Sequence, residues 1–291
     1  MDQVDLLPPI QAVYPIEYCA LVFKNREKVS DFEKVDNVRQ IAREMHVAFE
    51  KGKDRQSFHN VHHIEAVEVA TNLLLEKIDY SDPFGLKAAL ASWNSKKPLN
   101  ERLSQVDMEL GIKLAVSTHD LGNIVDTLGF TDSGFTPRFN RGYRSQGAEE
   151  RSKQIVQTLL MGSGVSREKI NKLLPFVQYL IDETKFNFLD SKTGFACFMR
   201  TVDQIGNGLF NTTDFATNLL YEMYGENPDA TFVPKSHFNF ARQRFSVLVP
   251  SQETRDGILK IWNRELPEEK QDYANTNTKI ADYLATYINP N

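Results

Sequence analysis

The chain has 291 residues, of which 41% are hydrophobic and 25% charged. It therefore has enough apolar side chains for one large domain or two ordinary ones, and wholesale disorder is excluded. Lys and Arg number 34 against 39 Asp and Glu, so the net charge of −5 lacks the basic excess of nucleic-acid and membrane-surface binders. The two cysteines, Cys19 and Cys197, are too few for a disulfide framework. The longest apolar runs have five residues and the N-terminus is acidic, so we expect a cytoplasmic protein with no nucleic-acid or membrane partner.

Most of the chain has apolar residues at the spacing of amphipathic helices, and no convincing stretch alternates with the period of a strand. The pattern therefore predicts an all-α protein. Taken in chain order, the expected helices span about 35–52, 58–78, 106–119, 147–161, 167–185, 195–208, 213–224, 236–248, 251–264 and 268–287.

Two stretches interrupt this helical pattern. Residues 81–101 contain prolines, a glycine and Trp93, and we expect a short helix with loops there. Residues 121–145 combine four glycines and a proline with several aromatic side chains, which predicts a long loop. A loop of that length inside a compact domain is usually functional or disordered.

Four of the six histidines lie in two clusters. The first is Phe58-His59-Asn60-Val61-His62-His63, in which His59 and His63 are four residues apart and share one helix face. The second is His119-Asp120, at the end of a strongly apolar helix. His46 and His237 are isolated, and we interpret them as structural residues; His62 points about 100° away from His63, which favours a rim or packing role.

Asp203 is the acidic residue that completes the pattern. It borders the apolar stripe of its predicted helix, where a carboxylate is costly to bury unless it is paired or bound to a metal. Two imidazoles and two carboxylates from His63, His119, Asp120 and Asp203 would form a mixed nitrogen and oxygen site for one divalent ion. This donor set suits Mn, Fe, Zn, Co or Ni, and Mg is possible.

The order His63, His119-Asp120, Asp203 resembles the H…HD…D pattern of the HD-domain metal-dependent phosphohydrolases. The segment from Phe58 to Val67 is also similar to the YHNxxHxxxV motif of cyclic-nucleotide phosphodiesterases and of many bacterial HD hydrolases. The resemblance covers roughly residues 35–210. It implies an HD-domain helical bundle at 35–225, with an N-terminal extension at 1–34 and a C-terminal helical extension at 226–291 that packs on the same core.

The resemblance also implies roles for individual residues. His63, His119, Asp120 and Asp203 would bind the metal, and His59 would protonate the leaving oxygen. A metal lowers the pKa of bound water towards neutrality and so supplies a hydroxide nucleophile, which Asp120 could orient. These roles predict a phosphomonoesterase or phosphodiesterase that acts on a nucleotide or another small phosphate ester.

Phosphate binding requires cations near this site. Arg141 and Arg144 lie in the aromatic-rich stretch 121–145, and we predict that they grip the phosphate group, with Lys185 as a further substrate-binding residue. The chain lacks the additional histidines that two-metal HD enzymes place after the HD pair, which favours a single ion. Two alternatives stay open: a non-catalytic HD-fold module that binds a nucleotide, and an HD-fold di-iron oxygenase. The oligomeric state is not determined by the sequence.

Overall fold

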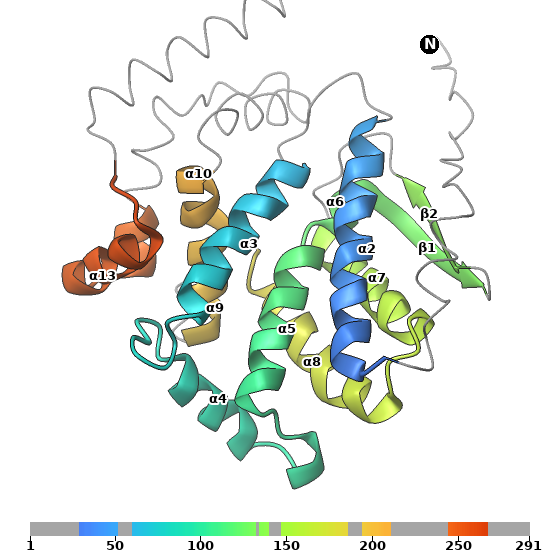
Figure 1. The fold of residues 1–291 in the computed structure, drawn as a ribbon, viewed down its shortest axis with the longest axis horizontal. Helices are drawn as coiled ribbons and strands as arrows, with labels where there is room; N and C mark the ends of the chain where they lie inside the picture. Colours follow the sequence, from blue (N-terminus) through green and yellow to red (C-terminus); the bar gives the residue numbers. More distant parts are fainter. Residues whose placement is uncertain are drawn as a thin grey trace, which may run out of the picture.

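The structure is a computed structural model, and its described residues are 29–51, 60–131, 134–139, 147–185, 194–210 and 244–266. These residues are mostly helical, which confirms the predicted all-α class. Figure 1 shows the helices gathered around α5, with one small hairpin at the edge of the molecule. The elements are α2 (Asp31–Lys51), α3 (Val61–Leu75), α4 (Leu86–Ser95), η1 (Leu99–Glu101), α5 (Gln105–Thr118), α6 (Leu121–Ile124), β1 (Val125–Thr131), β2 (Gly134–Phe139), α7 (Ala148–Gly162), α8 (Arg167–Asp182), α9 (Gly194–Arg200), η2 (Thr201–Gly206), α10 (Asn207–Phe210) and α13 (Gln252–Trp262).

Among the described helices, none has both the length and the apolar character that crossing a membrane requires.

The expected helices correspond closely to the observed ones wherever the chain is described. The expected stretch 81–101 contains α4 and the short η1 turn. The first helix begins at Asp31, four residues before its expected start, because Ser30 and Glu33 exchange capping hydrogen bonds there. The expected helices at 213–224 and 268–287 lie outside the described residues, and of 236–248 only 244–248 is described, as helix.

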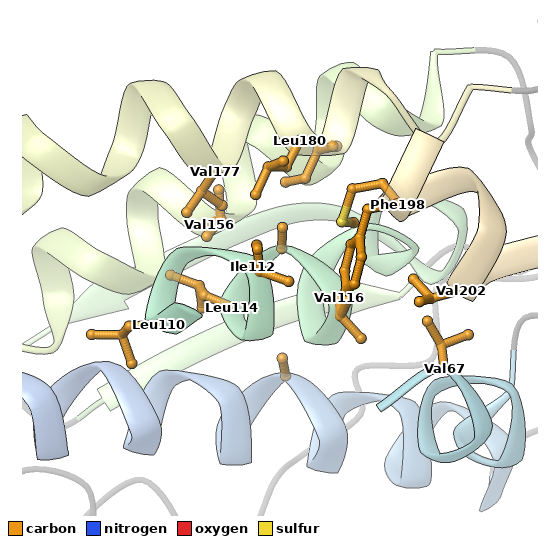
Figure 2. Close-up of a cluster of buried hydrophobic side chains, with 14 of the residues drawn as sticks. Val67, Leu110, Ile112, Leu114, Val116, Val156, Val177, Leu180, Phe198 and Val202 are labelled. Atoms are coloured by element: carbon orange, nitrogen blue, oxygen red, sulfur yellow. The ribbon is translucent and has the colours of Figure 1, made fainter. Parts of the chain in front are cut away.

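Helix α5 is the centre of the core. Its buried side chains occupy all sides of the helix, which is the pattern of a helix surrounded by other elements. Figure 2 shows Leu110, Ile112, Leu114 and Val116 of α5 meeting side chains of α3, α7 and α8 and of the helix that begins with α9. Because α5 ends at Thr118, the next two residues, His119 and Asp120, lie buried in this core rather than at the surface.

The described part of the stretch 121–145, residues 121–131 and 134–139, differs from the expected loop. It starts with the short helix α6 and continues as an antiparallel hairpin in which Phe130 pairs with Phe135, and Leu128 with Pro137. The sequence pattern did not predict these strands, because the register shifts between Val125 and Thr127 and a proline lies within the second strand. The alternation of apolar residues is therefore broken, and the helical class still describes the fold as a whole.

Helix α13 packs on the same core as the central helices. Trp262 is 1% exposed, and its indole Nε1–H donates to the carbonyl of Ala70 on α3 over 2.9 Å. Phe245 and Ile258 are also buried in this core cluster. The described part of the expected C-terminal extension, residues 244–266, thus shares its hydrophobic core with helices α3 and α5.

We expect Trp262→Ala to lower the free energy of unfolding by about 3–5 kcal/mol, because it removes a buried aromatic side chain and leaves a cavity. Urea denaturation followed by circular dichroism would measure this loss as one cooperative transition. Leu99→Ala is the control, since Leu99 is 79% exposed and its truncation should change stability little. A loss below about 1 kcal/mol for Trp262→Ala would mean that α13 contributes little to the core.

Candidate metal centre

His63 reaches the core because of the way α3 begins. Asn60 is the N-cap residue, and its side-chain oxygen accepts a hydrogen bond of 2.9 Å from the backbone N–H of His63. His63 is 1% exposed, whereas the neighbouring His62 side chain is 58% exposed and lies 3.4 Å from Glu65. The Asn60 of the sequence motif therefore fixes the helix start, and His62 is exposed while His63 is buried.

The His-Asp pair follows directly from the end of the buried helix α5. His119 Nδ1 lies 2.8 Å from the carbonyl oxygen of Val116. Because a carbonyl can only accept, Nδ1 carries a proton, which leaves Nε2 as the nitrogen that can bind a metal. Asp120 is also held, since its Oδ1 accepts a hydrogen bond of 3.1 Å from the Asn123 side-chain amide.

A serine from α7 braces the turn between α5 and α6. The hydroxyl of Ser152 donates to the carbonyl of His119 over 2.5 Å and accepts from the N–H of Gly122 over 2.8 Å. Gly122 permits this approach, because a Cβ there would lie 1.9 Å from the carbonyl oxygen of Ala148. The sequence analysis did not identify Ser152. Its only signal is a small polar residue on the apolar face of a helix.

Asp203 lies in the third element of the site, the η2 segment. Residues Thr201–Gly206 form π-helical turns within the helix that begins with α9 and ends with α10. Such turns are rare and are frequent at functional sites. The helix lies close to α3 because Gly206 has no side chain: a Cβ at Gly206 would lie 2.6 Å from the Cβ of Ala70. Ala70 is two turns along α3 from His63, so this contact helps to set the distance between His63 and Asp203.

The side chains of His63, His119, Asp120 and Asp203 meet at one point. His63 Nε2 lies 3.3 Å from His119 Nε2, 2.9 Å from Asp120 Oδ2 and 3.3 Å from Asp203 Oδ1. His119 Nε2 lies 3.2 Å from Asp120 Oδ2 and 3.4 Å from Asp203 Oδ1. The ligand atoms of His63, His119 and Asp203 lie within 4.8 Å of one another, so these three residues could hold a metal ion.

The electrostatics of this cluster follow from burial and from pairing. Burial lowers the pKa of His63 and of His119, but hydrogen bonds and charge interactions with Asp120 and Asp203 outweigh it, and both pKa values are raised. Burial raises the pKa of Asp203, yet hydrogen bonds from His119 and His63 lower it to about 2. Without a bound cation, the two imidazoles therefore retain protons that neutralise the carboxylates.

Of the four other predicted site residues, the structure describes Lys185. His59, Arg141 and Arg144 lie outside the described residues. Lys185 is described, and its ammonium group pairs with the Asp182 carboxylate at 2.7 Å. Its role in substrate binding stays a prediction.

The sequence and the structure were compared with protein-family models, with curated proteins and with solved structures, and no match was found.

We expect Gly122→Ala to displace His119 although Gly122 is not itself a candidate ligand. The new methyl group collides with the backbone of α7 and moves Ser152 away from the His119 carbonyl. The variant should lose at least 1 kcal/mol of stability, roughly the range for overpacking, and should bind zinc more weakly. Thermal denaturation and zinc titration would measure both effects. Gly257→Ala is the matched control, since a Cβ at Gly257 meets no atom within 4 Å. Equal behaviour of the two variants would contradict this role of Gly122.

The raised histidine pKa values predict opposite pH trends for the metal-free and the metal-loaded protein. In the metal-free protein the stabilisation from His63 and His119 is complete below their unfolded pKa of about 6.5 and is lost as pH rises through the folded values. Metal binding requires both rings without the extra proton, so stabilisation by zinc should grow over the same range. Melting temperatures between pH 6 and 8.5, with and without zinc, test this.

Two variants serve as controls for the pH experiment. His119→Asn should reduce the pH dependence of the metal-free protein, because one of the two rings with a raised pKa is removed. His62→Ala should retain it, because His62 is exposed. An unchanged pH dependence in His119→Asn would show that other groups cause it.

Proposed function

We propose that this protein is a metal-dependent phosphohydrolase that uses one divalent ion to hydrolyse a nucleotide or another small phosphate ester. The observation that carries the proposal is the convergence of His63, His119, Asp120 and Asp203 from three separate helical segments in the core. The order of these residues, and the motif around His63, resemble the HD-domain hydrolases.

The spacing of the donor atoms fits a metal ion. An ion with bonds of about 2.1 Å places adjacent donors about 3.0 Å apart in an octahedron and about 3.4 Å apart in a tetrahedron. The five separations between these nitrogen and oxygen atoms run from 2.9 to 3.4 Å. Imidazole and carboxylate ligands together suit Zn, Mn, Fe, Co or Ni.

In this proposal, different residues bind the ion, orient a carboxylate and transfer a proton. His63, His119 and Asp203 would hold the ion, with Asp120 beside both imidazoles as a further ligand. When bound, a divalent ion polarises a phosphoryl oxygen and acidifies a water molecule. The hydrogen bond from Asn123 to Asp120 Oδ1 fixes the orientation of this carboxylate, which can accept a proton from the attacking water. His59, by its match to the family motif, would give a proton to the leaving oxygen.

Elemental analysis and a hydrolysis assay test the proposal together. We expect the wild-type protein, reconstituted with manganese or zinc, to retain about one ion per chain and to release p-nitrophenol from p-nitrophenyl phosphate or its bis-ester. Asp203→Ala should lose the ion and reduce hydrolysis at least 100-fold, roughly the effect of removing part of a metal site.

The matched control exploits the two adjacent histidines. His63→Ala should lose the ion, whereas His62→Ala should retain both the ion and the activity, because His62 points outwards. A wild-type protein that binds no ion after reconstitution would overturn the metal centre. One ion per chain without hydrolysis of either ester or of a nucleotide panel would overturn the phosphohydrolase.

A further inference from the structure

Glu68, Ser117 and Arg39 form a polar junction where three helices of the core meet. They belong to α3, α5 and α2, which pack against one another (Figure 1). Ser117 is 0% exposed, and its hydroxyl donates to Oε1 of Glu68 over 2.6 Å. Arg39 completes the junction, because its Nη2 donates to the same Oε1 and its Nε donates to Ser117 Oγ, each over 3.3 Å. None of the three side chains is a candidate ligand of the metal centre.

The bond between Glu68 and Ser117 constrains the two helices in a way that apolar packing does not. Hydrophobic contacts are non-directional, so alone they specify the rotation of one helix against another less sharply. A hydroxyl that donates to a carboxylate has a preferred length, about 2.5–2.7 Å, and a preferred angle. The Glu68 side chain is only 14% exposed, so water competes little for this bond. The junction therefore holds α3 and α5 in one mutual orientation.

The two bonded residues lie close along their helices to the imidazoles of the centre. Ser117 is in the last turn of α5, directly after Val116, whose carbonyl holds Nδ1 of His119. Glu68 follows His63 by five residues, about 7.5 Å along α3. A change in the orientation of α3 against α5 would therefore move one imidazole relative to the other.

We propose that Glu68 is a positioning residue of the metal centre, which acts through Ser117 to hold Nε2 of His63 at its distance from Nε2 of His119. This inference rests on the ion-binding part of the proposed function and does not need its hydrolytic step. The two nitrogens are 3.3 Å apart, a separation that suits two ligands of one ion. Metal-ligand bonds vary by only about 0.2 Å, so a shift of about 1 Å in either helix would weaken one of them.

Substitutions at Glu68 in the whole chain test this role. Glu68→Leu removes the acceptor oxygen, and we expect it to weaken zinc binding at least 10-fold, roughly the effect of losing a group that orients a ligand. It should also change the visible absorption spectrum of the cobalt-loaded protein, which reports the geometry of the ligands. Glu68→Gln keeps an oxygen for the Ser117 hydroxyl and should restore the wild-type spectrum. It should still melt at a lower temperature, because it loses the charge that faces Arg39.

Two further variants complete the design. Ser117→Ala removes the other half of the bond and should change the cobalt spectrum in the same way. Combined with Glu68→Leu, it should weaken zinc binding no further, because both substitutions remove one interaction. Glu65→Leu is the matched control on the same helix, closer to His63 in sequence. The Glu65 side chain is 37% exposed and pairs with Arg43 of α2 rather than with α5, so zinc affinity and the cobalt spectrum should stay as in the wild type.

The outcomes separate this inference from the proposed function. Zinc affinity within about twofold of the wild type and an unchanged cobalt spectrum in Glu68→Leu and Ser117→Ala would refute it, and Ser117→Ala alone decides if Glu68→Leu does not fold. An equal change in Glu65→Leu, or no recovery in Glu68→Gln, would refute it as well. If the wild type binds an ion but hydrolyses no ester, the phosphohydrolase is wrong and the positioning role stands on the zinc and cobalt results. If the wild type binds no ion, both proposals are wrong.

Discussion

The need to neutralise ionisable groups inside an apolar core is the constraint on which this structure depends. His63, His119 and Asp120 are all buried, and burial alone would make each charge costly. The groups avoid this cost by meeting, since the Nε2 of each imidazole lies within 3.4 Å of a carboxylate oxygen of Asp120 and of Asp203. Protons can neutralise the cluster, and a divalent cation can replace them. The same arrangement therefore neutralises the charges without an ion and could hold one.

Close backbone packing holds these groups at their separations. Gly122 and Gly206 each lie at a contact where a methyl group would collide, with the backbone of α7 in one case and with Ala70 in the other. These contacts join α6 to α7 and η2 to α3, so the ligand-bearing segments are positioned by packing rather than by loops. Sites built on rigid elements keep their geometry more accurately than sites built on loops.

The sequence predicted the helices and the candidate metal-binding residues from local patterns. The apolar period identified α5, and the resemblance of the motifs pointed to His63, His119, Asp120 and Asp203, which the structure brings together. The hairpin was missed because its register shift breaks the alternation of apolar residues. Ser152 was missed for another reason: one polar residue on an apolar face does not reveal its partner until the helices are assembled.

The orientation of His119 depends on a group that no side-chain substitution can delete. Its Nδ1 donates to the main-chain carbonyl of Val116, one turn earlier in the same helix. In many metal sites a carboxylate holds the ring, and a single codon change removes it. Here the helix backbone itself keeps the proton on Nδ1. Side-chain substitutions at neighbouring positions therefore leave this hydrogen bond in place as long as the helix is preserved. Random mutagenesis would therefore reveal the candidate ligands and the packing residues, but it could not remove the carbonyl group that orients His119.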